Sequence, residues 1–297
     1  MNVYQVNALT DVPISLQVAE VTTHLERQPP PSSIVIMIHG YKFDHRDPAH
    51  CPHATMYHPH SVATDFRTRS WPSELRKAGG DGVAIGFSWP SRGTIRQAYT
   101  TAAHAAIDLA ELVKRLKQAF PDTAVQLMAH SLGVRVALEA FHQLEAHDID
   151  RAAFLFPSEY QNPVEQAVRS ALGKTVQILS IASKENYIFE QLFSCRRLAG
   201  SAAGPAFGQY QPKRPNIATL WIDQAHVIAR LNDLGIGIER REKRICHWSA
   251  YTREGIFELY SKWLLMPQTL PLYVLRDITH MDRKPAKDLV WGMGSPA

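Results

Sequence analysis

The sequence predicts an α/β protein in which a mostly parallel, doubly wound sheet of about eight strands carries helices on both faces. Short apolar runs rich in β-branched residues, such as residues 33–39 (SIVIMIH), are typical of strands buried on both sides. Between them, apolar residues recur every three or four positions, as along residues 95–120, which fits one face of a helix. Strands that alternate with helices require crossover connections and therefore parallel pairing.

The remaining elements follow the same alternation. Further strands are predicted at residues 82–89, 124–129, 152–157, 175–182 and 217–223. Helical spacing continues at residues 134–144, 164–172, 185–193, 226–231 and 256–265. Two segments, 41–72 and 198–215, show no regular spacing of apolar residues and are expected to be loop excursions. We therefore expect a single domain over residues 1–297, and assign no role to the tail 266–297.

The composition excludes several classes of protein. The chain has 297 residues, 45% of them hydrophobic, so it can bury a large core. The net charge of +4 is scattered, and the densest basic run, residues 240–244, is short and contains a Glu, which argues against nucleic-acid binding. Three cysteines are too few for a disulfide framework. No run reaches the length of about 18 apolar residues that a membrane-spanning helix needs. With no leader-like start, we expect a cytoplasmic protein.

Ser131 is the first candidate for catalysis. It follows the strand 124–129 within the motif A-H-S-L-G, one residue away from the pattern G-x-S-x-G of a nucleophile on a tight strand-to-helix turn. Small residues two positions to either side, Ala129 and Gly133, allow the close approach of backbone and helix that such a turn needs. The alternative is a helix N-cap, since serine is a favoured capping residue.

A nucleophilic serine needs donors for the oxyanion that it creates. A loop that turns sharply after the strand 33–39, at His39, Gly40 and Tyr41, is predicted to offer the Tyr41 N–H. The Leu132 N–H, next to the nucleophile, is the second expected donor.

A serine also needs a base and an acid, which in hydrolases on such a sheet follow the serine in the order acid, then histidine. His247 stands in a loop before the amphipathic segment 256–265 and is the preferred base, ahead of His226. Glu185, the first carboxylate after the strand 175–182, is the preferred acid. Asp223 is the second choice and Asn186 the third.

These residues resemble the α/β-hydrolase superfamily, and more narrowly its bacterial, serine esterase- or lipase-like members. The segments that carry the likeness are MIHGYKF, GFSWPSRG, MAHSLGVRVAL, SKENYIFEQLF and CHWSAYTREG. Together with the strands between them, they cover roughly residues 33–265. The resemblance implies a Ser-acid-His triad that works without metal or cofactor. The chain departs from the family pattern at Ala129, where Gly is commoner, and at the acid position, which has E-N where many relatives have Asp.

The sequence therefore predicts a serine hydrolase that acts on carboxylic esters or related small-molecule acyl compounds. One alternative is a metal site in the His-rich segment 39–60, although its irregular spacings differ from the compact pairs of zinc sites. Another is a non-catalytic binding protein that retains the fold and has lost the chemistry.

Overall fold

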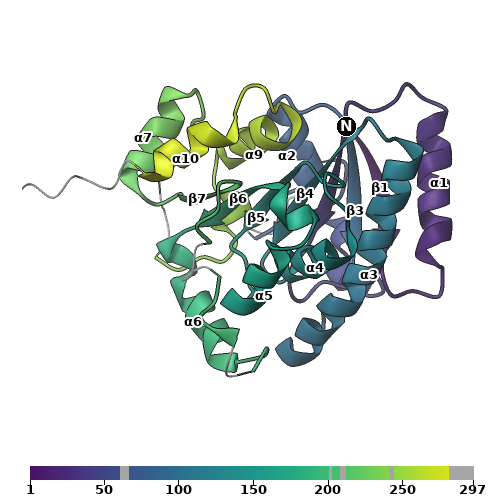
Figure 1. Ribbon diagram of the computed structural model, residues 1–297, viewed down its shortest axis with the longest axis horizontal. Helices are drawn as coiled ribbons and strands as arrows, with labels where there is room; N and C mark the ends of the chain where they lie inside the picture. The colour runs from purple at the N-terminus through teal and green to yellow at the C-terminus, as the bar shows by residue number, and fades with distance from the viewer. Residues whose placement is uncertain (61–66, 201–202, 208–211, 241–243, 281–297) are drawn as a thin grey trace, which may run out of the picture.

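A seven-stranded, entirely parallel sheet forms the centre of the computed structural model, which describes residues 1–60, 67–200, 203–207, 212–240 and 244–280 (Figure 1). The strand order is β1-β3-β2-β4-β5-β6-β7. The strands are β1 (Asn2–Asn7), β2 (Ser33–Ile38), β3 (Val83–Ser88), β4 (Ala124–His130), β5 (Arg151–Leu155), β6 (Gln177–Ala182) and β7 (Ile217–Trp221).

The predicted fold class is confirmed, and each of the six predicted strands is present. The strand β1 was not predicted. It is an edge strand paired in parallel with β3, from Asn2 beside Val83 to Asn7 beside Ser88. Its single buried residue, Val6, explains the omission, because a half-exposed edge strand has no continuous apolar run. The described residues thus form seven strands in place of the expected eight or so.

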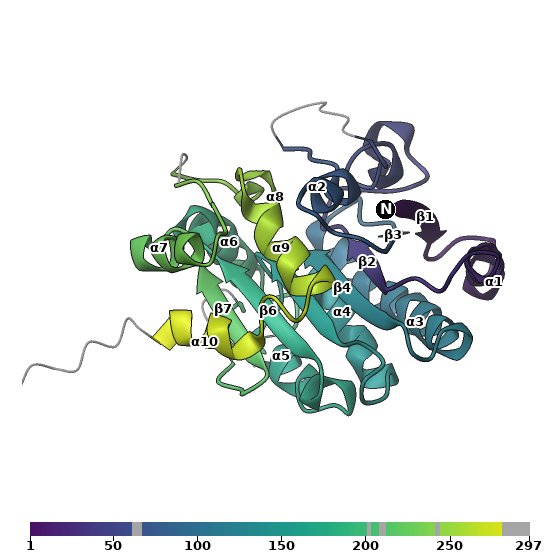
Figure 2. The same cartoon turned by 90° about the horizontal axis from the view of Figure 1, so that it is seen from above.

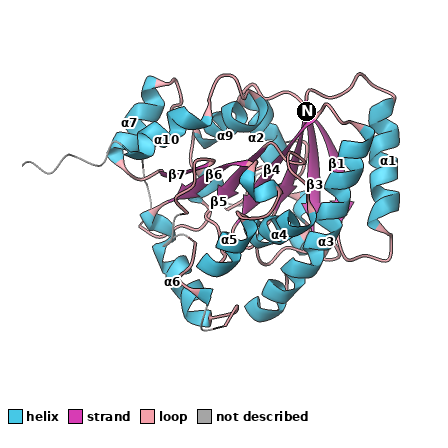
Figure 3. Cartoon of the chain, in the orientation of Figure 1, coloured by secondary structure: helices cyan, strands magenta, loops and turns pink. Residues whose placement is uncertain are grey.

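Helices cover both faces of the sheet (Figures 2 and 3). One face carries α1 (Ile14–Glu26), α3 (Ile95–Ala119), α4 (Gly133–Ala140) and α5 (Gln161–Ala167). The other carries α2 (Trp71–Lys77), α7 (Ala225–Asp233), α8 (Ser249–Thr252), α9 (Ile256–Leu265) and α10 (Leu272–His280). No helix in the described part of the chain is long and apolar enough to cross a membrane.

The two faces of β2 show why the strands are apolar throughout. Ile34, Ile36 and Ile38 pack into the core beneath α3 and α4, whereas Val35 and Met37 pack into the core beneath α9. All six residues of β2 are buried, as expected when alternate side chains enter two separate cores.

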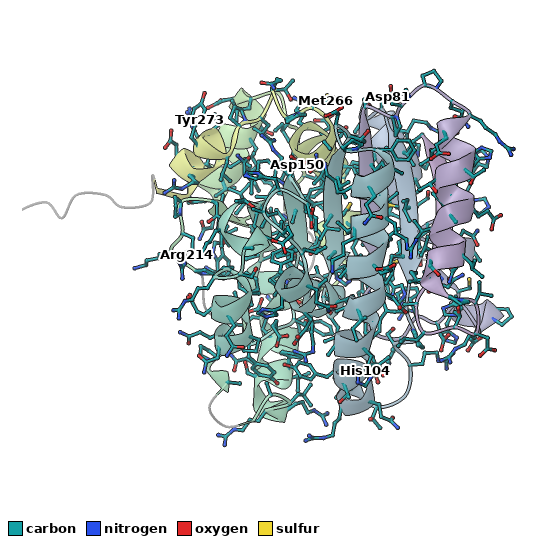
Figure 4. The ribbon with its side chains drawn as sticks, turned by 45° about the vertical axis from the view of Figure 1, so that its right-hand side comes forward. Asp81, His104, Asp150, Arg214, Met266 and Tyr273 are labelled. Carbon is teal, nitrogen blue, oxygen red and sulfur yellow. The ribbon has the colours of Figure 1, made fainter. Side chains whose placement is uncertain are left out.

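Because every strand is parallel, all carboxyl ends lie at one edge of the sheet. Figure 4 marks the opposite edge, where Asp81 and Asp150 lie just before β3 and β5. At the carboxyl edge, α6 (Tyr187–Arg196) follows β6, and Figure 1 shows it beyond the sheet, on the same side as the start of α3. Ligands bind at this edge in open α/β sheets, so a functional site is expected there.

Candidate active site

Ser131 lies on a sharp turn between β4 and α4. Its backbone has φ of +53°, in the left-handed region that a residue with a side chain adopts only under local constraint. Gly133 permits the turn, because a Cβ on it would lie 2.4 Å from the His39 carbonyl oxygen. The residue at the N-cap of α4 is Leu132, without a side-chain cap, so the Ser131 hydroxyl does not serve as a helix cap.

The hydroxyl of Ser131 instead faces His247. Its Oγ lies 2.8 Å from Nε2 of His247, which is hydrogen-bond distance, although the two residues are 116 positions apart in the chain. The Oγ is also 3.1 Å from Oγ of Ser158. The structure therefore brings together the predicted nucleophile and the preferred base. The other histidine considered, His226, is on α7.

His247 is held among aromatic rings. Phe189 stacks on it with 4.8 Å between ring centroids, and the His130 ring lies at the same centroid distance. The Nε2 of His130 contacts the His247 carbonyl at 3.0 Å. Burial lowers the pKa of His247 well below its ordinary value, and the nearby His130 lowers it further. The imidazole is thus neutral at neutral pH, as a proton acceptor must be.

The side chain that contacts His247 on its other ring nitrogen is Asn186, and the structure corrects the preference for Glu185. The Nδ1 of His247 lies 2.6 Å from Oδ1 of Asn186, which is buried. Glu185 and Asn186 are adjacent in the short 3-10 turn Lys184–Asn186, where successive side chains point in different directions. Only one of them can face the imidazole, and it is the amide.

Glu185 points into a separate ionic contact. Its carboxylate forms a buried ion pair with Arg253 and accepts a hydrogen bond of 2.6 Å from the Ser249 hydroxyl. Its carbonyl oxygen accepts a hydrogen bond from the Cys246 N–H. Glu185 thus fastens the segment that carries His247. Asp223, the second choice for the acid, accepts a hydrogen bond from the Lys184 N–H at 3.3 Å.

The loop after β2 contacts the serine closely. A Cβ on Gly40 would lie 2.9 Å from Cβ of Ser131, so glycine is needed for this approach. The Gly40 carbonyl oxygen lies 2.8 Å from Nδ1 of His39 and accepts a hydrogen bond of 2.9 Å from the Ser91 hydroxyl. Since the N–H of a trans peptide points away from its C=O, these contacts fix the direction of the Tyr41 N–H.

His39 is therefore a residue that orients the loop. Its Nε2 accepts a hydrogen bond from the Trp89 N–H at 3.1 Å, so Nδ1 carries the proton that is donated to the Gly40 carbonyl. Burial lowers the pKa of His39 to about 3, which keeps the ring neutral. Neither the Tyr41 N–H nor the Leu132 N–H donates a hydrogen bond to another described residue, so both are available to a ligand.

A cavity of about 420 Å³ opens onto the Ser131 hydroxyl. Its walls are mainly apolar and aromatic, and Lys42, Arg67 and Arg196 contribute exposed cations. No carboxylate is among the described residues that line it. The apolar lining residues include Phe43, Ile95, Leu132, Phe189, Leu192 and Phe193.

Histidines of the His-rich segment contact other side chains of the protein. Nε2 of His53 lies 2.8 Å from Oδ1 of Asn7, and Nδ1 of His50 lies 3.1 Å from Asp47. Within the described residues, no three His, Cys, Asp or Glu side chains gather in a way that would hold a metal ion.

A parallel α/β sheet with a strained serine at the carboxyl end of β4, a histidine on its hydroxyl and a glycine loop beside it defines the α/β-hydrolase class. The sequence profile of a family described as "Alpha/beta hydrolase of unknown function (DUF900)" matches residues 15–171, more than half of the chain. The chain belongs to this family.

Solved structures with a similar course of the chain include MenH from S. aureus, at 11% identity over 85% of this chain and 96% of that one, with a TM-score of 0.39. Carboxylesterase CesB (YbfK) from Bacillus subtilis has 10% identity over 85% of this chain and 98% of that one, with a TM-score of 0.36. A lipase-esterase related protein from Clostridium acetobutylicum has 9% identity over 52% of this chain and 75% of that one, with a TM-score of 0.30. Among curated proteins, none matches the sequence.

Proposed function

We propose that this protein is a serine hydrolase that cleaves carboxylic esters or related acyl compounds through Ser131, His247 and Asn186. One observation carries the proposal: the contact of 2.8 Å between the Ser131 hydroxyl and a neutral imidazole. A serine hydroxyl becomes a useful nucleophile when an adjacent base removes its proton. The free cysteines, Cys51, Cys195 and Cys246, agree with action in a reducing cytoplasm.

In the first half of the reaction, Ser131 Oγ attacks the carbonyl carbon of the substrate while Nε2 of His247 takes the hydroxyl proton. The carbonyl oxygen becomes an oxyanion, which the Tyr41 and Leu132 N–H groups stabilise. When the C–O bond to the alcohol breaks, His247 returns the proton to the leaving oxygen and an acyl-serine remains. A water molecule, deprotonated by His247, then releases the acid and restores the serine.

Asn186 selects the tautomer that this sequence of steps needs. Its Oδ1 accepts a hydrogen bond from Nδ1–H of His247, which leaves the lone pair of Nε2 directed at Ser131. An amide oxygen carries no charge, so Asn186 orients the imidazole without the full electrostatic stabilisation that a carboxylate would give to the imidazolium.

The first experiment is a panel of p-nitrophenyl esters from acetate to octanoate, with Ser131→Ala as the matched control. The apolar lining of the cavity favours acyl chains of intermediate length over acetate. We expect turnover by the intact protein and its loss in Ser131→Ala. If a well-folded intact protein turns over no ester and binds acyl ligands reversibly, the non-catalytic binding protein is the better account.

A further inference from the structure

Glu190 is a buried carboxylate that the reaction steps above do not use. It lies on α6, one turn after Asn186, and is only 6% exposed. Its Oε1 accepts a hydrogen bond of 2.9 Å from Nδ2 of Asn186. The candidate site is therefore a row of four side chains, in which Ser131, His247, Asn186 and Glu190 each contact the next.

The Asn186 amide has an oxygen at one end and an NH₂ group at the other. The tautomer of His247 depends on which of them faces the imidazole. With the oxygen toward Nδ1, the imidazole must carry its proton there, and Nε2 is free to accept the serine proton. With the NH₂ group toward Nδ1, the imidazole would carry its proton on Nε2 and be unable to act as base. An aspartate has two equivalent oxygens and does not face this choice.

We infer, on the basis of the serine hydrolase proposed above, that Glu190 is a positioning residue that fixes the Asn186 amide with its oxygen toward His247. An ionised carboxylate only accepts hydrogen bonds, so it attracts the NH₂ end and leaves the oxygen for the imidazole. The short helical spacing from residue 186 to residue 190 places the two side chains on one face of the chain as α6 begins. Burial raises the pKa of Glu190, and the hydrogen bond from Asn186 opposes that rise.

Two substitutions separate the role of the acceptor from that of the charge. Glu190→Gln retains an acceptor oxygen, whereas Glu190→Leu has a similar size and no acceptor. We expect Glu190→Leu to lower kcat about ten-fold or more at an unchanged KM, which is the scale of one lost hydrogen bond to a charged group. Glu190→Gln should recover most of that loss.

The decisive test repeats these changes in an Asn186→Asp background. A carboxylate at residue 186 needs no orienting partner and is repelled by Glu190. Glu190→Gln should therefore raise kcat in the Asn186→Asp background and lower it, or leave it nearly unchanged, in the natural protein. A role for Glu190 confined to folding would lower kcat in both backgrounds, and that result would overturn the inference.

A readout that does not use turnover is the ¹⁵N NMR spectrum of the His247 ring, which distinguishes the two neutral tautomers. We expect the Nδ1–H form in the natural protein and in Glu190→Gln, and a substantial Nε2–H population in folded Glu190→Leu. An unchanged tautomer in Glu190→Leu would contradict the positioning role. Labelling of Ser131 by a fluorophosphonate in the natural protein, measured in parallel, keeps the two questions apart, since its absence would count against the proposed hydrolase itself.

Discussion

The carboxyl ends of β4 and β6 each supply part of the candidate site, but they do so by different means. At the end of β4, backbone geometry sets the position of Ser131, through a left-handed φ and a glycine two residues later. At the end of β6, two polar side chains are adjacent in the chain, and the other contacts of these side chains determine which one hydrogen-bonds His247. Arg253 engages Glu185, and this leaves Asn186 for the imidazole.

Among the substitutions that test these two roles, Glu185→Gln is expected to have the largest effect. Glu185→Gln would leave the buried guanidinium of Arg253 without its ionised partner, since the two side chains are 2% and 4% exposed. We expect the free energy of unfolding to fall by about 3–5 kcal/mol, as measured by urea denaturation. The kcat of the folded fraction should stay within a few-fold of the natural value, because Asn186 keeps its contact with His247.

Asn186→Ala is the matched control and should show the reverse pattern, with a large loss of kcat and a smaller change in stability. Replacing both members of the ion pair, as Glu185→Leu with Arg253→Met, should recover part of the lost stability. If Glu185→Gln abolishes kcat in folded protein while Asn186→Ala does not, the two residues have been assigned the wrong way round.

A smaller effect is expected at the loop after β2. Gly40→Ala would place a methyl carbon 2.9 Å from Cβ of Ser131 and would displace the loop that presents the Tyr41 N–H. Loss of one oxyanion donor costs on the order of 10²–10³ in kcat. We expect a loss of about a hundred-fold in ester turnover, with folding preserved by circular dichroism. A natural rate in Gly40→Ala would exclude this loop as the donor of the oxyanion hole.

The smallest expected change concerns pH. The proposed reaction requires neutral His247, and the lowered pKa of this residue is expected to move the acid limb of kcat/KM to lower pH. The rate should therefore be constant from about pH 8 to below about 6.5 and decline only under more acidic conditions. Asn186→Asp introduces a negative charge beside the ring, which raises the pKa of His247 and should move the limb upward by about one pH unit or more. A limb near neutral pH in the natural protein would contradict the assigned environment.

Much of this architecture could be predicted because it depends on local pattern. The continuous apolar run of β2 and the helical spacing of α3 predict their elements closely, and α9 (Ile256–Leu265) has the predicted bounds. The motif around Ser131 likewise contains the small residues that its turn requires. Both signals act over a few neighbouring residues and need no knowledge of the tertiary structure.

The choice between Glu185 and Asn186 could not be made in this way. It depends on Arg253, which lies 68 residues further along the chain and reaches Glu185 only in the folded protein. One local signal does favour the amide: Asn186 and Glu190 are four residues apart at the start of a helical pattern, a spacing that permits a hydrogen bond between their side chains. The helices α1, α2, α8 and α10 were also not predicted.

Covalent labelling by a fluorophosphonate probe tests whether His247 activates Ser131. We predict that the intact protein is labelled on Ser131, located by mass spectrometry of the digested protein. Ser131→Ala should not be labelled, and folded His247→Ala should react at least about a hundred-fold more slowly. An intact, folded protein that resists the probe, or one that is labelled at the same rate without His247, would show that His247 does not activate Ser131.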